Sequence, residues 1–281
     1  MLQNCEILPT GNPGMLPLNA PVTGGGYCLP MPSLRPWLQT RLRLLRVGSH
    51  LLWGAALTLL LFPVASESGR MRLRSIWSRQ LLEILEVRIE ASVDIESGLE
   101  AGLLVANHIS FLDIFVINAV SPAAFVAKSD VAGWPLIGWL AGRNGTVFIE
   151  RGSRQAAHGA RQAMLAALGR GERLAIFPEG TTTAGDRVLP FHGALFQGAI
   201  DARASVHALA LSYHHADGSR SAAPAYTDDL SVMDCLQRIL QARGLVARLS
   251  LAARFRHPLP DRRQLAHRAH QAVVTALANA R

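Results

Sequence analysis

Short apolar runs alternate with helix-like segments from Met71 to the end of the chain. Seven runs have the length and composition of strands: 86–93, 103–106, 124–127, 146–149, 173–177, 206–213 and 245–256. Five segments have the character of helices: 111–119, 130–142, 154–169, 193–202 and 261–279. This alternation predicts an α/β fold with a largely parallel central sheet flanked by helices. In such sheets, ligands gather beyond the carboxyl ends of the strands.

An uncharged, strongly apolar stretch precedes this region. Residues 47–66 carry no charged side chain, and their length is close to what crosses a bilayer. Arginines flank the stretch on both sides: Arg35, Arg41, Arg43, Arg46, Arg70, Arg72, Arg74 and Arg79. A helix in one leaflet, with its arginines on anionic headgroups, explains both clusters more simply than a span, and a buried core helix is the third interpretation. We expect residues 34–80 to form a membrane-associated helical segment.

The first 33 residues differ from both regions. They contain six prolines and the run Gly24-Gly25-Gly26, without apolar periodicity. This composition predicts a disordered leader, and the basic start and apolar core of a signal peptide are missing. The expected organisation is therefore a leader (1–33), a membrane-associated helical segment (34–80) and an α/β domain (81–281).

The composition favours contact with lipid. Only 17% of the residues are charged, 49% are hydrophobic and the mean hydropathy is +0.20. The net charge of +8 comes almost wholly from arginine, since Lys128 is the only lysine. Such a charge suits anionic lipid, a phosphorylated substrate or nucleic acid. We exclude nucleic acid because the arginines are scattered and no helix-turn-helix, zinc-finger or RNP spacing is present.

The three cysteines indicate a reducing compartment. Cys5, Cys28 and Cys235 lie far apart and form no CxxC pair or disulfide framework. A reduced, cytosol-facing chain is the simplest interpretation.

The predicted strand at 103–106 leads directly into a candidate catalytic pair, His108 and Asp113. On one helix, five positions would place the two side chains on different faces. They can meet only if His108 stands in the loop and Asp113 in the first turns of the next helix. A carboxylate on one ring nitrogen would then leave the other free to take a proton from an alcohol. Taken alone, the pair is more typical of a helix cap with a satisfied polar contact.

Two further strand ends carry candidate binding residues. The strand at 146–149 delivers Arg151 to the same edge of the sheet, where a guanidinium fork suits phosphate or carboxylate, although pairing with Glu150 is the simpler alternative. The strand at 173–177 ends in Phe177-Pro178-Glu179-Gly180-Thr181. Gly180 permits a close backbone approach, while Glu179 and Thr181 supply an acceptor and a hydroxyl.

In combination, these residues resemble the PlsC-type glycerolipid acyltransferases, which include the 1-acylglycerol-3-phosphate acyltransferases. NHISFLD resembles their NHxxxxD block, GTVFIER their GxxFIxR block, and FPEGT is identical to their third block. The resemblance covers roughly residues 80–215. It implies that His108 and Asp113 are catalytic and that Arg151, Glu179, Gly180 and Thr181 contact the acceptor's glycerol and phosphate. It also assigns Lys128 to the anionic acceptor, and a solvated lysine is the alternative.

The resemblance implies transfer of a fatty acyl group from acyl-CoA or acyl carrier protein to a lysolipid hydroxyl. No metal or redox cofactor is expected. The expected location is the inner, cytoplasmic membrane, with the α/β domain facing the cytoplasm. A non-catalytic lipid-binding protein and an acyl hydrolase are the competing hypotheses.

Two departures from the family pattern bear on the acceptor. The chain has Pro190-Phe191-His192-Gly193 where many relatives have Pro-Phe-Lys-Gly, and Val206-His207 where they have Val-Pro. A histidine carries less charge than lysine at neutral pH, which weakens the case for a phosphomonoester. The same region also resembles enzymes that acylate lyso-ornithine lipid. We expect 1-acyl-sn-glycerol-3-phosphate as the acceptor, with lyso-ornithine lipid as the alternative.

Overall fold

The computed structural model describes residues 36–150, 154–227 and 230–279. The expected leader, residues 1–33, lies outside this part of the chain, and so does Arg151. The structure described below is that of the unit Pro36–Arg281.

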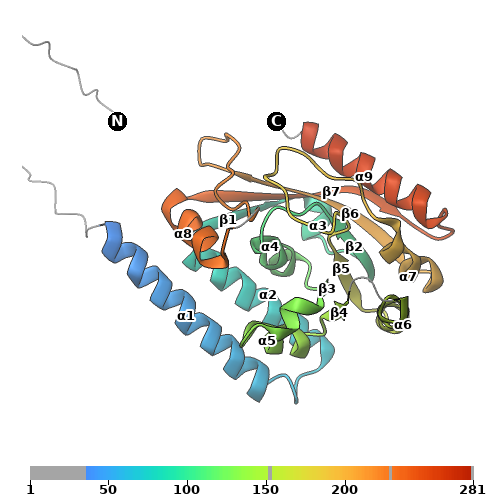
Figure 1. The fold of residues 1–281 in the computed structure, drawn as a ribbon, viewed down its shortest axis with the longest axis horizontal. Coiled ribbons are helices and arrows are strands. Elements are labelled where there is room, and N and C mark those ends of the chain that lie inside the picture. The colour runs from blue at the N-terminus through green and yellow to red at the C-terminus, as the bar shows by residue number, and fades with distance from the viewer. Residues whose placement is uncertain (1–35, 151–153, 228–229, 280–281) are drawn as a thin grey trace, which may run out of the picture. The chain divides into compact units, whose positions relative to one another are not determined.

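A seven-stranded sheet forms the centre of this unit (Figure 1). Its strands are β1 (Val87–Ala91), β2 (Gly102–Ala106), β3 (Ala124–Lys128), β4 (Val147–Ile149), β5 (Arg173–Ile176), β6 (Ser205–His214) and β7 (Leu245–Phe255). They lie in the order β1-β7-β6-β2-β5-β3-β4, and all neighbouring pairs are parallel apart from β6 and β7. The prediction of an α/β fold around a largely parallel sheet is confirmed.

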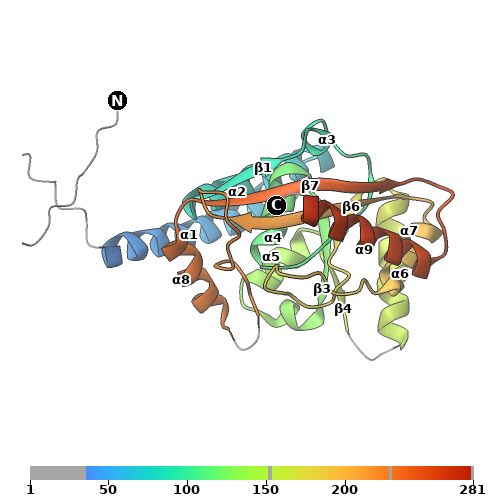
Figure 2. The same ribbon diagram turned by 90° about the horizontal axis from the view of Figure 1, so that it is seen from above.

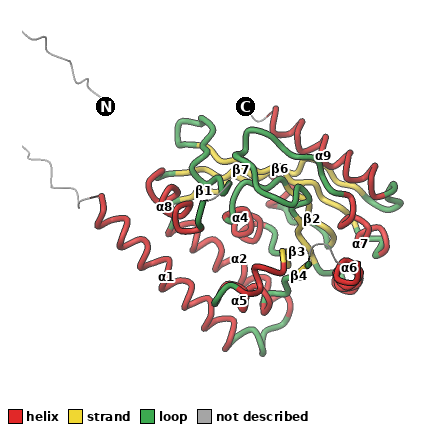
Figure 3. Tube along the Cα trace, in the orientation of Figure 1, coloured by secondary structure: helices red, strands yellow, loops and turns green. Residues whose placement is uncertain are grey.

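Helices cover both faces of the sheet (Figures 1 and 3). On one side lie α1 (Pro36–Leu60), α2 (Glu67–Ile84), α4 (Leu112–Val120), α5 (Ile137–Arg143) and α8 (Val232–Ala242). On the other lie α6 (Arg154–Gly169), α7 (Phe196–Asp201) and α9 (Arg262–Asn279), and Figure 2 shows α9 running along the sheet. The short helix α3 (Val93–Glu96) and two 3-10 turns, Ser129–Gly133 and Gly193–Leu195, complete the elements.

Strand β2 lies in the middle of the sheet and is buried on both faces. Leu103 and Val105 belong to the core beneath α6, α7 and α9, whereas Leu104 and Ala106 belong to the core beneath α2 and α4. A strand covered by helices on both sides needs a continuous apolar run, which explains this segment of the sequence. The rigid centre of the sheet therefore leads directly to His108.

The apolar stretch 47–66 forms half of a helical hairpin. Helix α1 ends at Leu60, before Pro63, which cannot continue a helix, and α2 begins after the N-cap Ser66. The ring of His50 stacks on Trp77 at 4.8 Å between centroids, and a Cβ on Gly54 would lie 2.5 Å from the Trp77 ring. Gly54 thus lets the two helices approach closely.

One face of α1 is buried in this hairpin and the other carries exposed leucines. Val47, His50, Gly54 and Thr58 are buried at helical spacing, while Leu52 and Leu59 are exposed. The interpretation of a buried core helix is therefore wrong. Within the described residues, no helix combines the length and the apolarity needed to cross a membrane.

The predicted elements differ from the observed ones in places. The expected helix 130–142 is a 3-10 turn followed by α5, since the residue before Pro135 is driven to an extended conformation. The expected helix 193–202 likewise divides into a 3-10 turn and α7. The expected boundary between residues 80 and 81 falls inside α2, whose Leu81 and Leu82 are part of the core.

His207 is a fully buried polar side chain on β6. Both ring nitrogens lack a hydrogen-bond partner among the described residues. Burial, aided by the positive charge of Arg254, lowers the pKa of His207 to about 4. The neutral ring is therefore the form that the fold tolerates. Protonation below the unfolded pKa of about 6.5 favours the unfolded chain.

We expect His207→Val to raise the free energy of unfolding by about 1 kcal/mol, because it removes unsatisfied polar atoms from the core. It should also flatten the loss of stability that occurs as the pH falls from about 6.5 to about 4. Thermal denaturation across this pH range measures both effects. His214→Val is the matched control, since His214 is also buried on β6 but bonds Ser212 and Gly218, and it should destabilise. A lower melting temperature for His207→Val at every pH would contradict this expectation.

Candidate active site

The carboxyl end of β2 places His108 and Asp113 in contact. Helix α4 begins at Leu112, so His108 stands in the preceding loop and Asp113 in the first turn, as the spacing predicts. His108 Nδ1 lies 2.8 Å from Asp113 Oδ2. Since a carboxylate only accepts, Nδ1 carries the proton and donates it to this bond. The tautomer is therefore fixed, and Nε2 is left with an unshared pair.

The Asp113 carboxylate is fully buried and surrounded by donors. Oδ2 also accepts from the backbone N–H groups of Ile109 at 2.7 Å and Ser110 at 2.9 Å. Oδ1 accepts from the Tyr213 hydroxyl at 2.7 Å. Burial and the charge of Asp113 raise the pKa of Tyr213, so its hydroxyl stays protonated and donates. Four donors hold the carboxylate that orients His108.

Asn107 fixes the backbone just before His108. Its side-chain amide donates to the Leu211 carbonyl at 2.9 Å, and its side-chain oxygen accepts from the Leu211 N–H at 2.8 Å. These bonds extend the pairing of β2 with β6 one residue beyond the last paired residue, Ala106. The loop that carries His108 therefore starts from a rigid point.

The His108 ring is exposed on one part of its surface only. Phe177, the first residue after β5, stacks on it with ring centroids 3.9 Å apart and an interplanar angle of 8°. The His108 side chain keeps 20% of its accessible surface, and Nε2 makes no hydrogen bond to any described residue. An aromatic face stabilises a ring that becomes an imidazolium. Nε2 is thus available to a hydroxyl.

Glu179 supports the same loop from the next strand end. Oε1 accepts from the His108 backbone N–H at 2.7 Å, and Oε2 accepts from the Leu189 N–H at 2.7 Å. The side chain is buried, and burial raises the pKa of Glu179 against these two bonds. Both oxygens are engaged with backbone, which indicates a positioning role rather than contact with an acceptor.

The loop after β5 folds against the loop after β2. The Thr183 N–H donates to the His108 carbonyl at 2.9 Å, and the Tyr226 N–H donates to the Ile109 carbonyl at 2.9 Å. Thr182 Oγ1 donates to the Tyr226 carbonyl. The backbone carbonyls of His108 and Ile109 are therefore bonded to segments far away in the sequence.

Three further expected binding residues, Lys128, Gly180 and Thr181, lie at the same edge of the sheet. Lys128 is the last residue of β3 and is exposed, and its register partner is Ile149, the last residue of β4. Gly180 adopts a φ of 72°, which suits glycine, and Thr181 next to it is exposed. Arg151 lies outside the described residues, two positions after β4. Contact of these residues with an acceptor stays a prediction.

Comparison with known proteins identifies the family of the chain. A family model described as Acyltransferase matches residues 86–212. The 1-acyl-sn-glycerol-3-phosphate acyltransferase of Neisseria meningitidis is 40% identical over 171 residues, which cover 61% of this chain and 67% of the relative. The lyso-ornithine lipid O-acyltransferase of Pseudomonas aeruginosa is 38% identical over 212 residues, covering 74% and 79%. The chain belongs to the acyltransferase family.

The fold of the acyltransferase has a counterpart among solved structures. The crystal structure of the 1-acyl-sn-glycerophosphate (LPA) acyltransferase PlsC from Thermotoga maritima superposes with a TM-score of 0.64 and 17% identity. The superposition covers 87% of this chain and 95% of that one. The resemblance to PlsC-type enzymes is confirmed by the relatives, and the fold by this structure.

An apolar cavity of about 180 Å³ lies next to the first turn of α4, which carries Asp113. Its lining comes from α1, α2, α4, α5 and β3, and it includes Ile114, Phe115 and Phe125. Phe125 also stacks on Phe177 at 5.9 Å, and Phe177 stacks on His108. Phe125 and Phe177 therefore connect the wall of the cavity to the His108 ring.

We expect Tyr213→Phe to lower kcat of the acyltransferase about tenfold, because Asp113 Oδ1 loses its donor and His108 is held less firmly. The KM values of both substrates should stay unchanged, since Tyr213 is buried behind Asp113. Steady-state kinetics with each substrate varied in turn measure kcat and both KM values separately. Tyr226→Phe is the control, because Tyr226 contacts the catalytic loop through its backbone. A raised acceptor KM with unchanged kcat would argue against a positioning role for Tyr213.

Proposed function

We propose that this acyltransferase moves a fatty acyl group from a thioester to the hydroxyl of a lysolipid. The orientation of His108 is the main support for this function. Its Nδ1 is fixed by a fully buried Asp113, and its Nε2 is left on a partly exposed ring that Phe177 and Phe125 connect to an apolar cavity. A non-catalytic lipid-binding protein would have no need for a buried carboxylate with four donors.

The reaction follows from the free Nε2. It takes the proton of the acceptor hydroxyl as the oxygen bonds to the thioester carbonyl carbon. The carbon–sulfur bond then breaks, and the imidazolium returns the proton to the departing thiolate. Asp113 keeps its charge throughout and holds the ring. No step changes an oxidation state, so the reaction requires no redox cofactor.

The apolar cavity suits the acyl chain of the donor. Its walls carry few polar groups, and Phe125 in its wall stacks on Phe177, which stacks on His108. A chain in this cavity would place its thioester carbon near Nε2. Acyl-CoA and acyl carrier protein both present such a thioester, and both are donors under this proposal.

The acceptor we propose is 1-acyl-sn-glycerol-3-phosphate. The Neisseria meningitidis relative is named for this acceptor, and the exposed Lys128 at the rim supplies positive charge. Arg151, at the end of the neighbouring motif, supplies a fork that matches phosphate oxygens. Lyso-ornithine lipid is the second candidate, because the Pseudomonas aeruginosa relative matches more of the chain and His192 replaces the usual lysine.

Kinetics with the two acceptors test this choice. We expect a higher kcat/KM for 1-acyl-sn-glycerol-3-phosphate than for lyso-ornithine lipid with the same palmitoyl thioester. Arg151→Lys should raise the KM of the preferred acceptor and leave the thioester KM unchanged, because an ammonium cannot form the fork. A higher kcat/KM for lyso-ornithine lipid would establish the second candidate. An effect of Arg151→Lys on the thioester alone would assign Arg151 to the donor.

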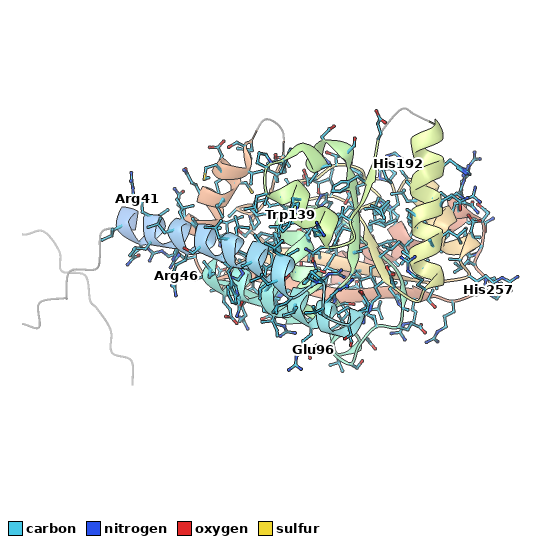
Figure 4. The ribbon with its side chains drawn as sticks, turned by 90° about the horizontal axis from the view of Figure 1, so that it is seen from below. Arg41, Arg46, Glu96, Trp139, His192 and His257 are labelled. Atoms are coloured by element: carbon cyan, nitrogen blue, oxygen red, sulfur yellow. The ribbon has the colours of Figure 1, made fainter. Side chains whose placement is uncertain are left out.

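We also propose that the protein works at the cytoplasmic surface of the inner membrane. Eleven of the fifteen exposed large apolar side chains among the described residues lie on α1, the turn after it, and the segment of α5: Leu42, Leu45, Leu52, Trp53, Leu59, Leu60, Leu61, Val64, Trp134, Ile137 and Trp139. We call this set the apolar face. Figure 4 shows Arg41 and Arg46 on α1 and Trp139 on α5. Apolar side chains flanked by arginines suit the interface of an anionic membrane.

We expect Leu52→Glu combined with Leu59→Glu to weaken binding to phospholipid vesicles at least about tenfold. These two exposed leucines would be buried in the membrane interface, and the variant loses both. The control combines Val93→Glu with Val274→Glu, which are exposed apolar residues outside the apolar face. Flotation with vesicles measures the bound fraction. Equal loss in both double variants would show that the apolar face has no special role.

A further inference from the structure

A second cavity, of about 210 Å³, lies at the opposite edge of the sheet from His108. Its lining includes Ala124, the first residue of β3, Gly145, which precedes β4, and Arg173, the first residue of β5. His108 follows the carboxyl end of β2, whereas these residues stand at the amino ends of their strands. This cavity is therefore separate from the His108 loop, and Arg74 stands between it and the apolar cavity, since Arg74 lines both.

Five arginines line this second cavity: Arg70, Arg74, Arg143, Arg170 and Arg173. Two carboxylates, from Glu67 and Glu172, line it as well, which leaves an excess of three positive charges. We call it the arginine cavity. Such an excess in one cavity is a binding environment for an anion.

The two carboxylates are already engaged. Glu172 pairs with Arg170 at 2.6 Å, and Glu67 lies 4.0 Å from Arg70 and 3.8 Å from Arg74. Within the described part of the chain, neither Arg143 nor Arg173 forms an ion pair. Arg173 donates only to Ser121 Oγ and the Met71 sulfur, and Arg143 lies over the Trp139 ring. Burial lowers the pKa of Arg74 and of Arg173, a cost that a bound anion would offset.

The arginine cavity adjoins the apolar turn between α1 and α2. Arg70 Nε donates to the Phe62 carbonyl at 3.0 Å, and the Arg74 guanidinium lies over the Phe62 ring. Leu60, Leu61 and Val64 of the same turn are exposed. An anionic group in the cavity would therefore have apolar protein surface directly beside it.

We propose that the arginine cavity binds the phosphate group of an anionic phospholipid headgroup, with the lipid chains against the apolar turn. The proposal rests on the membrane placement proposed above. Arginine forks match phosphate oxygens in pairs, and the two arginines without an ion pair can each supply one. A bound headgroup would hold the helical hairpin at the membrane while leaving His108 open.

A water-soluble lipid tests the site directly. Dihexanoyl phosphatidylglycerol, kept below its micelle concentration, is titrated into the full chain by calorimetry. We expect one bound lipid per chain, with dihexanoyl phosphatidylcholine and inorganic phosphate each binding at least about tenfold more weakly. Equal binding of inorganic phosphate would assign the cavity to a soluble anion. Absence of binding by all three would also overturn the proposal.

Variants locate the bound lipid. Arg143→Gln combined with Arg173→Gln should weaken lipid binding at least about tenfold, since two guanidinium groups are lost. If the first double variant fails to fold, Arg143→Gln combined with Arg170→Gln replaces it in the same measurement. Arg170 is more exposed, so its loss disturbs the fold less. The control combines Arg88→Gln with Arg256→Gln, two exposed arginines elsewhere that each form one ion pair and cause the same loss of charge. Equal weakening by the control would show a general charge effect and overturn the proposal.

Activity and neutral vesicles separate this proposal from the proposed function. The cavity variants should retain acyl transfer between short-chain soluble substrates within about twofold, because the cavity is remote from His108. They should also retain binding to neutral vesicles, which depends on the apolar face. Loss of transfer together with lipid binding would assign the arginine cavity to a reaction substrate and overturn the proposal. Loss of neutral-vesicle binding in the apolar-face variants tests membrane placement independently.

Discussion

Replacing His108 with alanine is expected to lower kcat about a thousandfold without unfolding the protein, because no other described group at the site can take the proton. The side chain is partly exposed and packs chiefly on Phe177, so its loss creates no closed core cavity. The backbone bonds of His108 to Glu179 and Thr183 remain in the variant. A loss confined to kcat would show that His108 acts on the reaction and not on binding.

Asp113→Asn is the partner variant for this experiment. Its amide nitrogen cannot accept from the donors that now surround the carboxylate. Because the two residues act as one unit, the loss in the double variant should be far smaller than the product of the single losses. Single-turnover rates and circular dichroism on all three variants provide the measurement. Turnover near the wild-type rate in a folded His108→Ala protein would exclude it as the base.

Glu179→Gln is expected to lower kcat about a hundredfold while the acceptor KM changes little, because displacing the His108 loop misaligns the base. Each carboxylate oxygen accepts a backbone N–H, and an amide offers only one acceptor. One N–H would therefore face an NH₂ group in a buried site, so the loop must shift. A residue that binds the acceptor would instead raise the acceptor KM when it is replaced.

The substrate dependence of Glu179→Gln decides between the two roles. Kinetics with the acceptor and the thioester varied separately give both KM values. Glu100→Gln is the control, since Glu100 forms a surface ion pair with Arg256 at 3.2 Å. A large rise in acceptor KM at unchanged kcat would support the acceptor contact that the family resemblance implies for Glu179.

The sequence predicts the contact between His108 and Asp113 because the information is local. The apolar run at 103–106 identifies a buried strand, and the spacing of His108 and Asp113 requires a loop and a helix start, as observed. The strand 245–256 is also close to β7, although its antiparallel pairing with β6 is not visible in any local pattern. Helix α8 was not predicted, although the capping box of Ser231 and Asp234 marks its start.

The supporting residues could not be predicted because their partners are distant in the sequence. Tyr213 reaches Asp113 across 100 positions, and Glu179 reaches the His108 backbone across 71. A tyrosine at the end of an apolar strand does signal a buried hydroxyl that needs a partner, but not which one. The sequence FPEGT shows only that Glu179 is an acidic residue at a strand end. The fold shows that its carboxylate accepts from the backbone N–H groups of His108 and Leu189.

Nε2 of His108 should direct the acyl group to a lipid hydroxyl and not to water. The most direct measurement is mass spectrometry of the products from palmitoyl thioester with and without a lysolipid acceptor. We expect diacyl lipid in equal amount to released thiol when acceptor is present, little free palmitate when it is absent, and neither product with His108→Ala. Free palmitate released at the same rate with or without acceptor would contradict this expectation and identify a hydrolase.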